Sequence, residues 1–351
     1  MSWQEAKSMQ GIKPRKVLLI GGAGYIGSVV AGYLLKKGYR VCNFDALLYQ
    51  TQACILPYLA HENYEFKYGD FTDSSELVEV LHDVTDVIIL AGLVGDPITK
   101  KYPELSQHIN NVGMHVMIDA LNGRGLDKVI FISTCSNYGL IGEDVLADEN
   151  WELKPLSLYA QAKVEIEQKI LSLKGRVDYH PVILRFATAF GISPRTRFDL
   201  TVNEFVRDLY LGKDLVVYDH ETWRPYCHVL DFSLALEQVL LAPNQLVAFE
   251  VFNAGSEKNN YTKKMLVDEI KRFIPHAKVT YQQNGSDPRN YRVNFNKIKK
   301  VLAFNPRFTV VDGIQELLLA LKNNLFTDVE DRPNFYGNYQ LHYSVPEIAE
   351  V

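Results

Sequence analysis

Tyr159 and Lys163 have the types and spacing needed for proton transfer to or from an alcohol. They lie four positions apart in a segment with a helical pattern, so the phenol and the ammonium share one helix face. A free phenol has a pKa of about 10 and is a poor base at neutral pH. A nearby ammonium favours the phenolate and lowers that pKa, so the pair is a candidate proton acceptor. The alternative is an amphipathic helix that carries both residues by chance.

Gly21, Gly24 and Gly27 form a second group with chemical potential near the start of the chain. They directly follow an apolar run, Lys16–Ile20, and open a helical pattern over residues 24–37. Glycine is needed where backbone turns tightly, approaches a pyrophosphate and packs against a strand. The helix N-terminus then offers free N–H groups to phosphate. The spacing predicts a dinucleotide site, and a tight turn without a ligand is the alternative.

Asp45 ends the second apolar run, about twenty residues after the glycines, where a carboxylate can bind a ribose 2′-hydroxyl. It would repel a 2′-phosphate, which favours NAD over NADP; a solvated aspartate at a strand end is the alternative. Two later strands are expected to end near Asp70 and near Ala91. The first end offers a place for the adenine, and the small residues at the second let the cofactor lie close to the backbone. The residues expected at the cofactor are Gly21, Gly24, Tyr25, Ile26, Gly27, Asp45, Asp70, Phe71, Leu90, Ala91, Gly92, Tyr159 and Lys163.

Strands that alternate with helices must position these residues. The expected strands are Lys16–Ile20 and residues 40–44, 66–68, 87–91, 129–133 and 181–185. The expected helices between them include residues 24–37, 73–82, 106–123 and 158–173. This alternation predicts an α/β fold, a Rossmann-type doubly wound parallel sheet with helices on both faces. Thr134, directly after the strand at 129–133, could place a hydroxyl beside Tyr159 and the reacting oxygen.

The pattern changes after about residue 190. Loops at 193–199, 219–226 and 285–292 are interleaved with helices at 202–211 and 231–241, which predicts a smaller C-terminal α/β substrate-binding lobe. We therefore expect an N-terminal extension (1–15), an NAD-binding domain (16–190), a region that is mainly the interleaved substrate lobe (191–326) and a tail (327–351). The tail is expected to pack on the surface or at a subunit contact.

Composition narrows the function classes. With 47% hydrophobic residues and a net charge of −5, the chain has no electrostatic reason to bind nucleic acid or an anionic membrane. Residues 1–15 lack the apolar core of a signal peptide, and no stretch is apolar enough to span a bilayer. The four cysteines form no CxxC pair, so we expect reduced thiols, no metal site and a cytoplasmic protein.

Over about residues 15–325 the chain resembles the extended short-chain dehydrogenases/reductases, in the group of NAD-dependent nucleotide-sugar epimerases and dehydratases. The motifs that carry the resemblance are the glycine loop 21–27, Gly69-Asp70, Ala91-Gly92 in place of the usual double alanine, Asn110, the segment 133–139, Tyr159 with Lys163, Leu184-Arg185, Phe190-Gly191 and the segment 224–231. The closest likeness is to the UDP-glucose 4-epimerase type.

The resemblance implies roles for individual residues. Tyr159 is the active-site base, Lys163 its partner, and Thr134 the hydroxyl that positions the sugar. Arg224 and Arg289 match positions that grip the nucleotide diphosphate, which suits the planar fork of arginine. Arg195 is expected near the nucleotide, and Asn203 is expected to touch the substrate. The resemblance also implies a homodimer or higher homo-oligomer, formed through the helices at 106–123 and 158–173.

The reaction is narrowed by the two residues after Thr134. The 4,6-dehydratases of this family place a carboxylate there, whereas this chain has Cys135 and Ser136, which counts against dehydration. We therefore expect NAD-dependent oxidation at C4 of a GDP-, UDP-, CDP- or dTDP-linked sugar, by an epimerase or a C4 dehydrogenase. Residues 93–97 and 191–200 resemble a subgroup that modifies GDP-linked or other hexoses and heptoses. The alternatives are a ketosugar reductase, which Asp45 disfavours, and a non-catalytic NAD-binding sensor, which usually lacks the tyrosine or the lysine.

Overall fold

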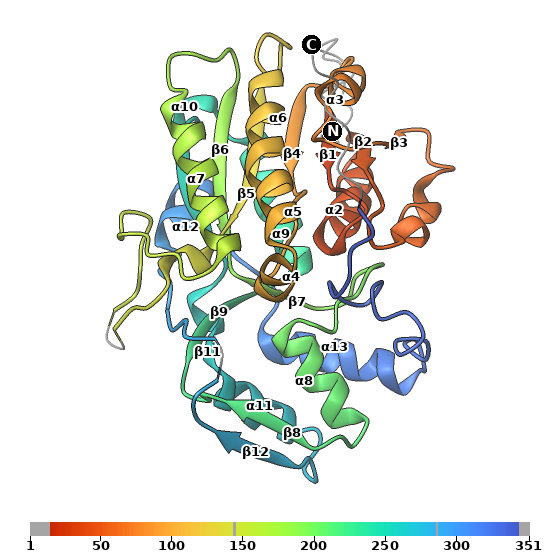
Figure 1. Cartoon of the computed structure of the whole chain (residues 1–351), viewed down its shortest axis with the longest axis vertical. Coiled ribbons are helices and arrows are strands. Elements are labelled where there is room, and N and C mark those ends of the chain that lie inside the picture. The colour runs from red at the N-terminus through yellow and green to blue at the C-terminus, as the bar shows by residue number, and fades with distance from the viewer. Residues whose placement is uncertain (1–14, 143–144, 286, 344–351) are drawn as a thin grey trace, which may run out of the picture.

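The computed structural model describes residues 15–142, 145–285 and 287–343. Its centre is a seven-stranded sheet in the order β10-β6-β5-β4-β1-β2-β3, in which every neighbouring pair is parallel (Figure 1). The strands are β1 (Lys16–Ile20), β2 (Arg40–Asp45), β3 (Tyr64–Tyr68), β4 (Asp86–Ile89), β5 (Lys128–Thr134), β6 (His180–Phe186) and β10 (Glu250–Ala254). The chain reverses its direction across the sheet between β1 and β4, where open α/β sheets bind ligands. The predicted Rossmann-type fold is confirmed.

Helices bury both faces of this sheet. One face packs against α2 (Tyr25–Lys36), α9 (Val229–Leu241) and α12 (Asn296–Leu302). The other packs against α3 (Ser74–Val80), α6 (Met114–Ala120) and α7 (Leu158–Ser172). In β1, Val17 and Leu19 point into the first layer while Leu18 and Ile20 point into the second. Burial on both sides explains why the strands read as continuous apolar runs.

The helix expected at residues 106–123 is interrupted. Its place is taken by α5 (Pro103–Gln107), a π-helical turn (His108–Gly113) and α6. The π turn carries Asn110, whose carboxamide donates to the carbonyl of Leu93 at 2.9 Å and accepts from the Leu93 N–H at 2.7 Å. π turns within helices are frequent at functional sites. This one joins the helix to the segment that follows β4.

The C-terminal lobe is built from small sheets and helices. Its strands are β7 (Thr188–Phe190), β8 (Leu215–Tyr218), β9 (Trp223–His228), β11 (Asn260–Thr262) and β12 (Val279–Gln282). Its helices are α8 (Thr201–Tyr210), α11 (Lys263–Lys271) and α13 (Val310–Lys322), and the short helices elsewhere are α4 (Asp96–Lys101) and α10 (Asn244–Val247). Part of the loop expected at 219–226 is strand β9, because it pairs with β7 and β11, which are distant in sequence. The helix α9 and strand β10 return to the main sheet.

The chain after α13 rises from the lobe toward the main sheet, as the dark blue segment in Figure 1 shows. Phe335 and Tyr336 are buried in the core of the lobe, with residues of α8 and α13. Farther along, Leu341 is buried against Leu93 and Ile98, which follow β4. We call residues 334–343 the strap, because they join the lobe to the main sheet. Among the described residues, no helix has the length and apolarity required to cross a bilayer.

Candidate active site

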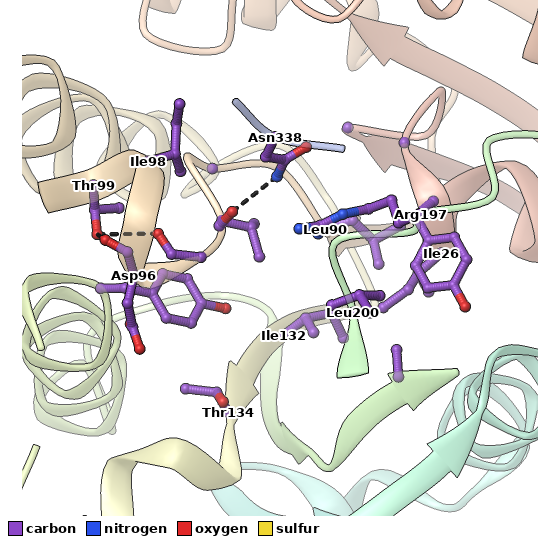
Figure 2. A pocket seen from close by; sticks show the side chains of 18 of the residues that line it. Ile26, Leu90, Asp96, Ile98, Thr99, Ile132, Thr134, Arg197, Leu200 and Asn338 are labelled. Atoms are coloured by element: carbon purple, nitrogen blue, oxygen red, sulfur yellow. Dashed lines mark hydrogen bonds between the residues drawn. The ribbon is translucent and has the colours of Figure 1, made fainter. Parts of the chain in front are cut away.

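A cavity of about 950 Å³ lies at the carboxyl ends of the sheet strands, between the sheet and the lobe. This volume is at the upper end of the usual range for small-molecule sites, about 300–1,000 Å³. The glycine loop, the ends of β2, β4 and β5, and the first turns of α7 line it together with residues of the lobe. Figure 2 shows Thr134 and Asp96 on one side of this pocket and Ile26 and Arg197 on the other.

The glycine loop forms a cradle that side chains would fill. Gly21 has a φ of +85°, and a Cβ placed there would lie 2.6 Å from the backbone nitrogen of Ala91. A Cβ on Gly27 would lie 2.6 Å from the carbonyl oxygen of Gly21. Gly24 is the N-cap of α2 and has no side chain to cap the helix, so the first turn of α2 faces the cavity uncapped. These features fit a pyrophosphate bound at a helix N-terminus.

Asp45 is tied to the glycine loop. One carboxylate oxygen accepts the N–H of Ala23 at 2.9 Å, and the other accepts the N–H of Leu47 at 2.8 Å. Burial raises the pKa of Asp45, and the two N–H groups oppose that shift. The carboxylate lines the cavity, where its remaining lone pairs can accept ribose hydroxyls. The other residues predicted at the cofactor also line the cavity: Tyr25, Ile26, Asp70, Phe71, Leu90, Ala91 and Gly92.

The catalytic candidates come from two adjacent elements. Strand β5 ends at Thr134, whose hydroxyl lies 2.9 Å from that of Ser136. Helix α7 starts after Ser157, whose Oγ accepts the N–H of Ala160 at 3.3 Å, so Tyr159 lies in the first turn and Lys163 in the second. All three candidates, Thr134, Tyr159 and Lys163, line the cavity.

Lys163 is buried, and its Nζ donates to the carbonyl of Ile132 at 2.8 Å. Burial lowers its pKa to about 7, against the opposing charge of Glu167. Burial also raises the pKa of Tyr159, and the charge of Asp96 adds to this shift. A desolvated lysine carries less charge at neutral pH, and the expectation that Lys163 lowers the pKa of the phenol stays a prediction. The positive charge of a bound nicotinamide would favour the phenolate.

Two arginines and two carboxylates form a cluster at the lobe side of the cavity. Arg224 of β9 donates to Asp287 at 2.9 Å. Arg289 donates to the same carboxylate at 2.7 and 2.8 Å and reaches Asp96 at 2.8 Å. Although burial favours the neutral form of Asp287, the two arginines hold its pKa below the ordinary value. The cluster thus presents the predicted diphosphate-binding arginines, each oriented by a carboxylate.

The other two predicted substrate residues have structural contacts. Asn203 is fully buried on α8 and is absent from the cavity lining, because its carboxamide bonds to the backbone of Gly191 and Arg197. The structure therefore does not bring Asn203 to the cavity with the other predicted substrate residues. Arg195 borders the cavity, but its guanidinium donates to three strap carbonyls and to the side chain of Asn338. These hydrogen bonds hold the strap in place, and a role of Arg195 in substrate binding stays a prediction.

The strap forms one wall of the cavity. Asn338 donates to the carbonyl of Val94 at 2.8 Å, the dashed line beside Asn338 in Figure 2. Tyr343 donates to Asp70 at 2.6 Å, and both side chains line the cavity. The strap therefore connects the lobe to the segment that follows the edge strand β3, where the adenine is expected. Sequence reasoning assigned it no such role, because the hydrogen bonds that tie it to the cavity walls join residues more than 130 positions apart.

Asp96 was not predicted as a site residue, although the segment 93–97 that contains it was noted. It is the first residue of α4, which follows the carboxyl end of β4, and this position was a usable signal. Asp287 and Lys263 also line the cavity. Neither follows a strand of the seven-stranded sheet, so no nearby sequence pattern marked them as site residues.

The parallel sheet, the glycine turn before α2 and the Tyr159–Lys163 pair define an NAD-dependent enzyme of the extended short-chain dehydrogenase/reductase type. The model of the NAD dependent epimerase/dehydratase family matches residues 17–255, and the chain belongs to that family.

Known proteins of this family are similar over most of the chain. The chain is 27% identical to a UDP-glucose 4-epimerase of Corynebacterium glutamicum over 320 residues, 86% of this chain and 94% of that one. A dTDP-glucose 4,6-dehydratase of Bacillus anthracis in complex with NAD superposes with a TM-score of 0.77 at 25% identity, covering 88% of this chain and 97% of that one. A UDP-glucuronic acid 4-epimerase of Bacillus cereus superposes with a TM-score of 0.80 at 22% identity, covering 88% and 99%.

Proposed function

We propose that this enzyme oxidises the C4 hydroxyl of a nucleotide-diphosphate sugar and acts as a 4-epimerase or a C4 dehydrogenase. The observation that carries the proposal is one cavity lined by the glycine loop, by Thr134, Tyr159 and Lys163, and by the cluster of Arg224 and Arg289. The names of the similar proteins, which include 4-epimerases from several bacteria, support the same substrate class.

Different residues of the site act on different parts of the substrate. Arg224 and Arg289 bind the diphosphate, which directs the sugar toward β5 and α7. The Thr134 hydroxyl hydrogen-bonds the C4 oxygen, and the Tyr159 phenolate oxygen accepts its proton. Lys163, when charged, favours that phenolate and holds the nicotinamide ribose. NAD, when bound, accepts the hydride from C4.

The residues after Thr134 disfavour dehydration. Cys135 is fully buried, donates to the carbonyl of Arg185, and has a thiol pKa that burial raises well above its ordinary value. Ser136 is a hydroxyl bonded to Thr134. Neither group is a carboxylic acid or a base near neutral pH, so the oxidised sugar has no acid–base pair on this turn to remove water across C5 and C6.

The test incubates the purified enzyme with UDP-, GDP-, CDP- and dTDP-linked sugars and follows both NADH absorbance and product mass. A sugar isomer without lasting NADH identifies an epimerase, and a ketosugar with stoichiometric NADH identifies a C4 dehydrogenase. A product lighter by one water contradicts the proposal. NAD binding without any reaction contradicts it too and favours a sensor. Tyr159→Phe is the control, because it keeps the ring and removes the hydroxyl.

We also propose that the enzyme works as a homodimer in the cytoplasm. The segment that contains α6 and the helix α7 carry apolar side chains open to solvent, namely Val112, Val116, Leu158 and Leu171, between 37% and 46% exposed. Apolar side chains gathered on adjacent helices are typical of a subunit contact. Sedimentation of the wild type against Val116→Glu tests this, and an unchanged mass for the variant, or a monomeric wild type, contradicts it.

A further inference from the structure

Asp96 is a carboxylate inside the cavity to which the proposed chemistry assigns no part. One of its oxygens, Oδ2, pairs with Arg289 at 2.8 Å, while Oδ1 is buried and has no hydrogen-bond partner. Its backbone is held in place, since the Thr99 hydroxyl donates to the carbonyls of Gly95 and Asp96 at 3.1 and 3.2 Å. Figure 2 shows Asp96 beside Thr99 at the edge of the pocket. A fixed carboxylate with an unused oxygen is an acceptor available to a ligand.

The neighbours of Asp96 locate it relative to a bound sugar. On one side it contacts Arg289, which the proposed function assigns to the diphosphate. Figure 2 shows Asp96 on the same side of the pocket as Thr134, which the proposed function places at C4, and Tyr159 lines the same cavity. The charge of Asp96 also raises the pKa of Tyr159, after the larger effect of burial. In a sugar nucleotide the hexose ring separates the diphosphate from C4. A sugar bound in this way would have its ring beside Asp96.

The guanidinium groups around this position are already paired with carboxylates: Arg224 and Arg289 with Asp287 and Asp96, and Arg197 with Asp199. Together with Lys263, which lines the same part of the cavity, the two arginines and two carboxylates of the cluster carry 3 − 2 = +1, and the Arg197–Asp199 pair adds no net charge. Each phosphate of the diphosphate brings about one negative charge. A bound sugar nucleotide thus makes the site about one charge negative before any charge on the sugar is counted. A carboxylate at C6 would add to that excess.

We infer that Asp96 determines the sugar specificity: its carboxylate accepts hydrogen bonds from hydroxyls of a neutral sugar and excludes sugars that carry a carboxylate, such as hexuronates. This inference rests on the proposed function. Like charges about 6 Å apart at an effective dielectric constant of about 20 correspond to roughly a 100-fold discrimination. Hydroxyl donors, by contrast, satisfy the buried Oδ1.

The test compares matched pairs of ligands: UDP-glucose with UDP-glucuronate, and GDP-mannose with GDP-mannuronate. The variants are Asp96→Asn, which keeps the shape and removes the charge, and Asp96→Ala as a second probe. Glu104→Gln on α5 is the control, because it removes a carboxylate that is exposed and outside the cavity. Binding is measured by calorimetry with NAD in a Tyr159→Phe background, and turnover is measured in the unsubstituted background.

The enzyme with Asp96 intact should bind the neutral member of at least one pair roughly 100-fold more tightly. Asp96→Asn should bring that ratio close to one, mainly by tighter binding of the uronate, and Glu104→Gln should leave it unchanged. A purely structural role would weaken both members equally. Equal binding, a preference for the uronate, a ratio insensitive to Asp96, or no binding in any pair overturns the inference. Selective binding without turnover contradicts only the proposed function.

Discussion

Gly21→Ala is the substitution for which the structure gives the most definite expectation. The residue has a φ of +85°, which costs an alanine about 1–2 kcal/mol. Its Cβ would also lie 2.6 Å from the nitrogen and 2.7 Å from the Cα of Ala91, both backbone atoms of the segment after β4. Forcing such an overlap into packed structure costs about 1–3 kcal/mol more. The total loss in free energy of unfolding should be about 2–5 kcal/mol.

Gly123→Ala separates the two contributions. Gly123 has a φ of +75°, yet a Cβ there meets no atom within 4 Å. This variant should therefore lose only the conformational part, about 1–2 kcal/mol. Urea denaturation of the two variants beside the wild type measures the difference, which should be about 1–3 kcal/mol, or about 1–4 °C in Tm for a chain of this size. Gly21→Ala should also weaken NAD binding, and Gly123→Ala should not. Equal destabilisation of the two variants would show that the overlap with Ala91 is relieved without cost and would refute the reasoning.

Three further outcomes are expected. Tyr159→Phe should lower kcat by about 100- to 10,000-fold and leave NAD affinity nearly unchanged in a binding titration; a kcat near that of the wild type would remove the phenol from the mechanism. Burial places the pKa of Lys163 at about 7, below its ordinary 10.5, so the unfolded chain binds more protons between these values. The free energy of unfolding should therefore rise from about pH 7 to 10.5 relative to Lys163→Met, and parallel profiles of wild type and variant would argue against a lowered pKa. Tyr343→Phe removes the strap hydrogen bond to Asp70 and should speed NAD release up to about tenfold in a displacement experiment. The control Tyr281→Phe, on β12, should release NAD at the wild-type rate, and identical rates for all three proteins would mean that the strap does not hold the cofactor.

The elements that line the main part of the cavity were predictable because their signals are local. Apolar runs of strand length, the glycines at 21, 24 and 27, and the spacing of Tyr159 and Lys163 each lie within a few residues. In a parallel sheet all carboxyl ends meet at one edge, so motifs that follow β1, β2, β4 and β5 must converge. That geometric rule is why one cavity holds both motifs.

The differences from the expected structure arise from contacts distant in sequence and from burial that a short motif does not reveal. Strand β9 was expected to be part of a loop because its pairing partners lie in β7 and β11. Asn203 was carried over from a resemblance, but its carboxamide is consumed by backbone groups of the turn at Gly191 and Arg197. The lowered pKa of Lys163 depends on the full depth of burial, which no short motif encodes. The cofactor contacts and the domain boundaries stay predictions.

The strap imposes an order on events during protein synthesis. Residues 334–343 leave the ribosome after every other residue that lines the cavity, and a nascent chain folds its earlier parts first. Until the strap docks, the cavity therefore lacks the wall that Asn338 and Tyr343 contribute. The wall that the strap forms is therefore the last part of the site to be completed.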